Sequence, residues 1–207
     1  MPVILDKKRQ AVPVELTQES TVGDYLKWIG TMVPEGRVLV RIQVDGAILE
    51  GRALTEVRGR EMGESTLMLT TGDQKELSLT MLGKLAALIE WLTPQHREVA
   101  SMLEQGNTQP ALERLAGILS AWQEIQSAYG NLAKMLKLSL KELPVREVTG
   151  EAVLEEFCKH LGEIQSALTN KDFVLLSDIL QYEMEGAIAS WMGLLEATLG
   201  VVEPVGV

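Results

Sequence analysis

The residues with the most specific chemical potential are a histidine and two glutamates at helical spacing. Glu156 precedes His160 by four residues, and Glu163 follows it by three. On an α-helix these three side chains share one face, as the ligands of helical metal sites do. Helical di-iron sites use Glu-x-x-His in two copies, whereas this chain has His-x-x-Glu once. The pattern therefore favours a solvated polar face, and we expect neither a metal site nor a cofactor.

The second histidine and the single cysteine do not complete a nucleophilic site. Cys158 and His160 lie about 200° apart around a helix, so their side chains point in different directions. We expect Cys158 to be a small, partly buried apolar residue. His96 falls in the first turn of a predicted helix, where capping or exposure accounts for it. With one cysteine and two histidines in the chain, a Cys/His or zinc site would have to draw on other residues.

Other catalytic patterns do not occur in the sequence either. The carboxylates of Asp178, Glu183 and Glu185, and the pair Glu155-Glu156, belong to predicted long helices, where such groups are usually solvated. There is no Gly-x-Gly-x-x-Gly after a strand, no Gly-Lys-Ser/Thr and no Gly-x-Ser-x-Gly. We therefore name no catalytic residue and expect a non-enzymatic protein.

The charge balance and the chain's first residues exclude further classes of function. The 207 residues include 19 basic and 29 acidic ones, a net charge of −10, whereas nucleic-acid binding needs a basic face. Apolar residues precede the basic cluster at 7–9, which is the reverse of a signal peptide. No run approaches the ~18 apolar residues of a membrane span. With a single cysteine, a reducing compartment fits best, and we expect a cytoplasmic protein.

The elements that must position these residues change character near Asp73, which predicts two domains, 1–73 and 74–207. The first has period-two patterning and the second has period 3.6. A capping box at Thr21 and Asp24 predicts a helix start, and Asp45-Gly46 predicts a hairpin turn. Around that helix the first domain is predicted to contain strands at 3–5, 11–16, 38–44, 47–49 and within 65–71, with a loop over 51–64.

This order of elements, with the helix start Thr21-Val22-Gly23-Asp24 and the turn Val44-Asp45-Gly46, resembles a ubiquitin-like β-grasp domain. The resemblance covers roughly residues 1–72. It implies one sheet with one helix and a protein-binding module or a sulfur or protein carrier. Carriers end in a free Gly-Gly tail, but this part ends inside the chain at Thr71-Gly72-Asp73. A carrier role is therefore not expected.

The second domain is predicted to be an antiparallel bundle of about five helices, so the fold class is α+β. A first helix carries Leu82, Leu85, Ile89 and Leu92, and Thr93-Pro94 is predicted to begin a second that stops at Gln105-Gly106. The remaining helices are predicted to begin at Thr108, with Thr149 as cap, and at about Phe173, the last running to Leu199. A heptad-like seam is predicted on the fourth helix at Leu154, Phe157, Leu161, Ile164 and Leu168.

A weak internal sequence similarity suggests two similar helical units. Ser101-Met102-Leu103 precedes a turn and a helix with Trp122, and Ser166-Ala167-Leu168 precedes a turn and a helix with Trp191. A pseudo-twofold arrangement of the two units would explain this similarity, and coincidence explains it equally well.

The tryptophans are the candidate interaction residues. Trp91, Trp122 and Trp191 lie on or beside apolar stripes and are expected in the core or in an interface. Trp28 lies off the predicted inward face of its helix. Because exposed aromatic residues mark protein interfaces, we name Trp28 and Trp122 as a possible partner surface.

Two further resemblances concern the helical part and the whole chain. The turn Glu104-Gln105-Gly106-Asn107 before a long amphipathic helix, with a Leu-rich acidic composition, is similar to flagellin-type export chaperone bundles. The two-part layout, including the segment 171–183, resembles bacterial proteins to which no function is assigned. Neither resemblance names an activity.

The first functional hypothesis is a non-enzymatic interaction module, an adaptor or chaperone that holds a helical partner in a groove of Leu, Met and Trp side chains. The same apolar surplus could form a homodimer. The alternative is a small-molecule-binding protein or enzyme with a pocket between the halves, using residues from Arg52 to Arg60 together with Glu183 or His160.

Overall fold

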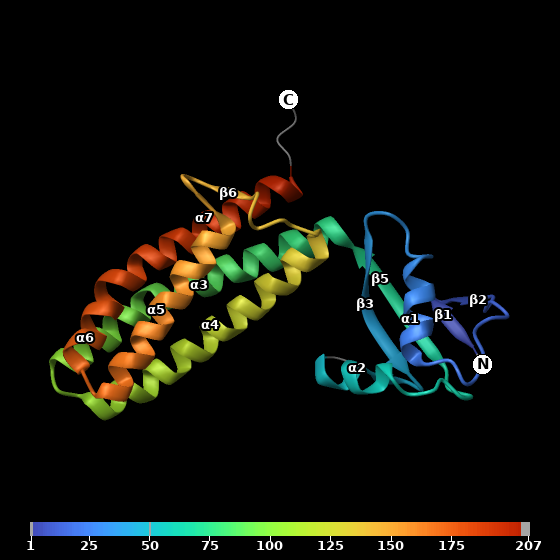
Figure 1. Ribbon diagram of the computed structural model, residues 1–207, viewed down its shortest axis with the longest axis horizontal. Helices are drawn as coiled ribbons and strands as arrows, with labels where there is room; N and C mark the ends of the chain where they lie inside the picture. Colours follow the sequence, from blue (N-terminus) through green and yellow to red (C-terminus); the bar gives the residue numbers. More distant parts are fainter. Residues whose placement is uncertain (1, 50, 204–207) are drawn as a thin grey trace. The chain divides into compact units, whose positions relative to one another are not determined.

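The computed structural model describes residues 2–49 and 51–203 and has the predicted α+β architecture (Figure 1). A mixed sheet with helices comes first, and five α-helices follow. The described residues form two compact units, the first ending at Leu77 and the second beginning at Ser78. Each unit has its own cluster of buried apolar side chains.

The first unit is built on a five-stranded sheet with the order β2-β1-β5-β3-β4. Strands β1 and β5 run parallel, and the other neighbours are antiparallel. The core of this unit joins β1 and β5 to helix α1 through Val3, Leu67, Tyr25 and Ile29, which are fully buried. The elements are β1 (Val3–Leu5), β2 (Lys8–Gln10), α1 (Val22–Gly30), β3 (Arg37–Val44), β4 (Ala47–Ile48), α2 (Gly51–Arg58) and β5 (Leu67–Asp73).

Local signals at α1 and at the β3–β4 turn are confirmed. The Thr21 hydroxyl accepts a hydrogen bond from the backbone N–H of Asp24 at 3.2 Å, and the Asp24 carboxylate accepts one from the Thr21 N–H at 3.1 Å. Asp45 and Gly46 both have positive φ, as a tight hairpin turn requires. These signals need only neighbouring residues, which explains why the sequence shows them.

Two predictions about the first unit are wrong. The second strand lies at Lys8–Gln10 instead of 11–16, because Asp6 and Lys7 adopt positive φ and turn the chain back at once. The Asp6 carboxylate holds this turn by accepting hydrogen bonds from the N–H and hydroxyl of Thr71, at 2.7 and 2.6 Å. The predicted loop at 51–64 contains α2, because no helix breaker occurs between its glycines at 51 and 59 and Leu54 and Val57 pack on the core.

The second unit consists of long helices that share one apolar core (Figure 1). A short hairpin, β6 (Pro144–Val145) and β7 (Val148–Thr149), joins α4 to α5. The last helical segment contains a π-helical turn, η1 (Ile179–Glu183), between α6 and α7. The α-helices are α3 (Gln74–Glu104), α4 (Thr108–Leu136), α5 (Gly150–Asn170), α6 (Phe173–Asp178) and α7 (Met184–Val202).

The number of helices agrees with the prediction, but the breaks between them do not. No helix begins at Thr93-Pro94, because α3 runs through Pro94 without interruption. Pro94 lies on the exposed side, while Leu92 and His96 are buried on the other side. Burial of one continuous face therefore outweighs the backbone hydrogen bond that a proline removes. The fifth helix arises instead where η1 separates α6 from α7.

An aromatic cluster fills the centre of the bundle. Trp122 lies 4.5 Å from Phe157 and 5.8 Å from Trp191, measured between ring centroids, and Tyr129 lies 5.6 Å from Trp191. All four rings are fully buried. Trp122 therefore has no surface to offer a partner, so its place in the predicted partner surface is wrong. Its helix turns it toward α5 and α7, which the sequence of α4 alone does not reveal.

The other two tryptophans lie at the periphery of their units. Trp91 is 54% exposed, so it is not a core residue. Trp28 is half-buried beside the core of the first unit, with its ring edge-on to Tyr25 at 6.4 Å. Trp28 thus keeps part of its surface accessible, as the predicted contact requires.

Candidate functional site

His160 lies inside the bundle, which corrects the predicted solvated face. The residue is only 6% exposed. The buried face of α5 includes Val153, Phe157, His160, Ile164 and Ala167. Three of these, Val153, His160 and Ala167, lie one position before the residues that the predicted seam would bury. Packing of α5 against α6, η1 and α7 selects this face, and the seam at Leu154, Leu161 and Leu168 is only half-buried.

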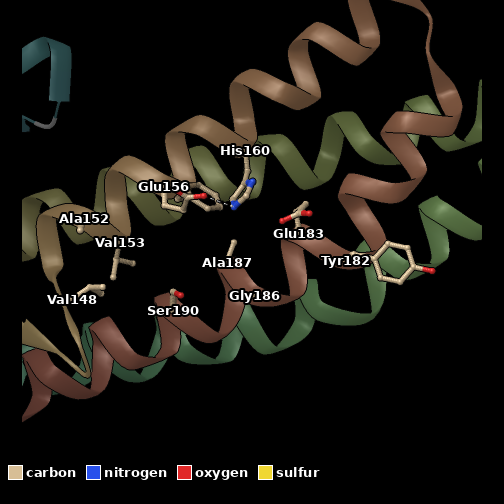
Figure 2. A pocket seen from close by; sticks show the side chains of 11 residues that line it. Val148, Ala152, Val153, Glu156, His160, Tyr182, Glu183, Gly186, Ala187 and Ser190 are labelled. Atoms are coloured by element: carbon tan, nitrogen blue, oxygen red, sulfur yellow. Dashed lines mark ion pairs between the residues drawn. The ribbon is translucent and has the colours of Figure 1, made fainter.

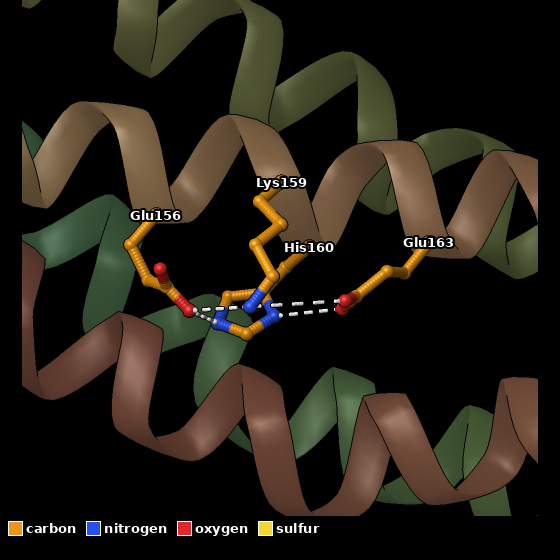
Figure 3. A network of polar contacts seen from close by, with 4 residues as sticks. All are labelled: Glu156, Lys159, His160 and Glu163. Atoms are coloured by element: carbon orange, nitrogen blue, oxygen red, sulfur yellow. Dashed lines mark hydrogen bonds and ion pairs between the residues drawn. The ribbon is translucent and has the colours of Figure 1, made fainter.

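Charged side chains of α5 surround the ring of His160 on both sides (Figure 3). Its Nδ1 lies 3.1 Å from Glu163 Oε2, and its Nε2 lies 3.5 Å from Glu156 Oε1. Lys159 Nζ bridges the same two carboxylates, at 3.1 Å from Glu156 and 4.0 Å from Glu163. A carboxylate only accepts hydrogen bonds, so in the contact between His160 Nδ1 and Glu163 the ring N–H is the donor.

The cluster shifts the titration of its lysine. The hydrogen bond to Glu156 raises the pKa of the Lys159 ammonium, and the charges of Glu156, Glu163 and Glu183 add to the effect. Because these groups are largely exposed, the pairs stabilise the fold only weakly. Their main consequence is positional, since they hold His160 and the two glutamates along one side of α5.

A cavity of about 430 Å³ opens beside this cluster, between α5 and the η1–α7 segment (Figure 2). We call it the α5–α7 cavity. Its apolar lining comes from Val148, Ala152, Val153, Phe157 and Ala187. Its polar lining comes from Glu156, His160, Glu183 and Ser190. Figure 2 shows His160 and Glu183 facing each other from opposite helices, with Val148 at one end and Tyr182 at the other.

A second cavity of about 390 Å³ continues along α5 on the other side of His160. We call it the α5–α6 cavity. It shares His160 and Glu183 with the first cavity and adds Lys159, Glu163, Ser166, Leu175 and Ile179. His160 and Glu183 therefore lie between the two cavities and line both of them.

The π-helical turn η1 supplies the wall opposite α5. The backbone N–H of Met184 bonds to the carbonyl of Ile179, five residues back, where an α-helix would use residue 180. The turn buries Ile179 and Leu180 and leaves Tyr182 64% exposed. Such insertions occur frequently at functional sites, and nothing in the sequence of this segment predicts one.

His96 is the buried titratable group that sequence reasoning missed. It is 2% exposed, in the middle of α3 and not at a helix start. Its Nδ1–H donates to the Leu92 carbonyl at 2.8 Å, and its Nε2 accepts the indole N–H of Trp122 at 3.0 Å. Burial lowers the pKa of His96, so the neutral ring is favoured. His96 follows the buried Leu92 by four residues, and this spacing, which puts both on one helix face, could have predicted the burial of His96.

Cys158 is exposed, contrary to the prediction of partial burial, and it lies outside both cavities. Among the residues that the structure describes, no cluster of three His, Cys, Asp or Glu side chains is placed to hold a metal ion. Within the same residues, no helix has the length and apolar character needed to cross a membrane.

The fold and the site define a helical bundle domain with an open, partly apolar cavity against one of its helices. Residues 80–194 match the model of the family Domain of unknown function (DUF8042), which covers more than half of the chain. The protein belongs to this family. A search of the curated proteins and a search of the solved structures find no match to the chain.

Proposed function

We propose that the protein is a non-enzymatic interaction module, an adaptor or chaperone, whose DUF8042 bundle binds a partner protein in the α5–α7 cavity. The observation that carries the proposal is the cavity itself. It is open to solvent, its floor is apolar, and Tyr182 and Val148 stay exposed at its ends. Grooves of this kind between helices accept the apolar face of a partner helix.

Exposed apolar side chains on α6 and η1 support the same proposal, because two of the three line one of the cavities. Val174, Leu175 and Tyr182 lie within nine residues of one another on α6 and η1, and all three are exposed. Single exposed apolar residues are common, but a group of them beside a cavity is typical of an interaction site. A protein partner, or a second copy of the chain, would remove these side chains from water.

The first unit adds a second element to the proposal. Its sheet order and the packing of helix α1 on its core support the resemblance to a ubiquitin-like β-grasp domain, and many such domains bind proteins. Trp28 is the contact residue that we propose for this unit. A cytoplasmic location in a bacterial cell, which rests on the single cysteine and on the resemblances, belongs to the same proposal.

Filling the cavity tests the proposal. A β-carbon added at Gly186, which lines the cavity, meets no atom within 4 Å, so a side chain can start there without backbone strain and Gly186→Leu would fill part of the cavity. Gly162→Leu is the matched control, because Gly162 is equally uncrowded and exposed on α5 but outside both cavities.

The tagged full chain would be used to capture proteins from its native host, with quantification by mass spectrometry. We expect a stoichiometric partner that is lost with Gly186→Leu and retained with Gly162→Leu. Retention by Gly186→Leu would contradict the site. Loss with Trp28→Ala alone would move the contact to the first unit, and recovery of the chain itself would identify a homodimer.

The convergence of Glu156, His160 and Glu183 on one cavity favours a second candidate, a small-molecule-binding protein or enzyme. Ligand cavities commonly combine an apolar lining with a few convergent polar groups. A thermal-shift screen would detect this function as a compound that stabilises the wild-type chain and the Gly162→Leu variant but not Gly186→Leu.

A further inference from the structure

We infer that the partner segment bound at this site is a basic amphipathic helix, an inference that rests on the proposed function. It is carried by the charges beside the two cavities and by their placement, since they follow one another along α5 and share His160 and Glu183. We call the two cavities together the α5 trench.

The length of the α5 trench indicates an extended occupant. Its residues on α5 run from Ala152 to Ser166. The fourteen steps from the first of these residues to the last correspond to about 21 Å at the rise of an α-helix. A compact ligand would fill one hollow, whereas a helix of about four turns would lie across both.

The two hollows predict two apolar anchors on the occupant. The α5 residues that line the first cavity are centred near Glu156, and those that line the second are centred about six positions later along the helix. These centres are about 9 Å apart, slightly less than two turns of a helix, so the anchors would be about seven residues apart. Phe157 lies in the floor of the first hollow and Ile179 in that of the second, so each offers an apolar contact.

The charges along the α5 trench select a basic helix. Glu156, Glu163 and Glu183 line it, and Lys159 is the one lysine or arginine among its described lining residues. Glu183 lies between the two cavities, so a lysine or arginine between the two anchors of the bound helix would contact it. A helix from a second copy is less suitable, because residues 75–207 carry eighteen acidic and ten basic side chains.

A selection experiment tests the inference without a known partner. A displayed library of randomised 16-residue helical peptides would be selected on the immobilised full-length chain, with Gly186→Leu for counter-selection. We expect enriched peptides with net positive charge and two apolar positions about seven residues apart. Their affinity should fall at least tenfold with Gly186→Leu and stay within twofold with Gly162→Leu.

A pair of charge-neutralising substitutions then tests the electrostatic part of the inference. Removing one exposed charge partner costs a few tenths to one kcal/mol, so Glu183→Gln should weaken a selected peptide about threefold at low salt. Glu155→Gln, on the exposed side of α5 outside both cavities, should leave the affinity unchanged.

Three outcomes would overturn the inference, and they separate it from the proposed function. Acidic or uncharged peptides that lose binding with Gly186→Leu would contradict the basic class only. No selected peptide at all, with a cellular partner still lost by Gly186→Leu, would contradict the helical class only. Peptides or partners that bind Gly186→Leu as well as wild type would contradict both.

Discussion

The bundle buries two histidines in opposite kinds of surroundings, one in the α3–α4 hairpin and one in the hairpin that α5 makes with the α6–α7 segment. His96 is bonded to a backbone carbonyl and an indole, both deep in the core. His160 is bonded to Glu163 and close to Glu156, whose side chains are 40% and 58% exposed. The partners of His96 are thus closed to any ligand, whereas those of His160 face two cavities.

The two histidines show that burial alone does not mark a functional site. His96 joins α3 to α4 through Trp122 and contributes to the core. His160 stands where two cavities meet, so a bound molecule can reach its neighbours. The first hairpin therefore encloses the partners of its histidine, whereas the second leaves the partners of its histidine accessible from the cavities.

Among the substitutions that test this comparison, removal of the Trp122 side chain should cause the largest loss of stability. Trp122→Ala empties the centre of the aromatic cluster and removes the donor to His96, so we expect a loss of about 3–5 kcal/mol in the free energy of unfolding. Urea denaturation at neutral pH measures it. Trp91→Ala, at an exposed position of the neighbouring helix, should cost less than about 1 kcal/mol. Equal costs would contradict the described core.

Matched phenylalanine substitutions would separate the hydrogen bond from the packing. Trp122→Phe leaves the buried Nε2 of His96 without its donor, and such a group costs about 1–3 kcal/mol. Trp191→Phe breaks no comparable bond, because the Trp191 indole N–H has no hydrogen-bond partner among the described residues. We expect Trp122→Phe to be the more destabilising variant by about this amount. The opposite order in denaturation experiments would show that His96 is not held as described.

The pH dependence of stability would sharpen the contrast further. Burial lowers the pKa of His96 below its ordinary 6.5, so the unfolded chain takes up a proton at a pH where the folded chain does not. The contribution of His96 is therefore complete above about pH 6.5 and lost as the pH falls below it, with a slope of up to about 1.4 kcal/mol per pH unit.

The control for this effect is His96→Leu, which carries no titrating group at the position. Between pH 7 and pH 5, wild type should lose more stability than His96→Leu does, although the variant is less stable at pH 7. Parallel curves for the two proteins would contradict the lowered pKa of His96.

The smallest effect belongs to the exposed ion pairs around His160. Lys159→Gln removes contacts with Glu156 and Glu163 that are worth about 0.2–1 kcal/mol in all, and high salt should abolish the difference from wild type. Thermal unfolding at low and high salt would show it. A loss of several kcal/mol that salt does not change would place these charges in a closed core like that of His96.

Local residues predicted much of the fold. The capping box of Thr21 and Asp24, the turn at Asp45-Gly46 and the cap at Thr149 were all predicted, because each depends on side chains within a few residues. The β2 hairpin was missed because its turn is stabilised by Thr71, which is 65 residues from Asp6. The continuity of α3 through Pro94 was missed because it depends on packing.

The candidate site could be predicted only in part. The grouping of Glu156, His160 and Glu163 on one helix face follows from their spacing and is confirmed. The burial of His160, the approach of Glu183 and the cavities do not follow, because α6, η1 and α7 create them. Trp122 was placed on a surface for the same reason, since one helix does not show which of its faces its neighbours cover.

The α+β class, the caps and turns and the helical spacing of the α5 cluster can be predicted from the sequence, because they depend on backbone preferences and near neighbours. The tertiary structure alone decided which histidine is enclosed and which faces a cavity. The physical reason is that burial is shared between helices distant in the chain. The π-helical turn, the packing of α7 on α5 and the bond from Trp122 to His96 exist only once those helices have met.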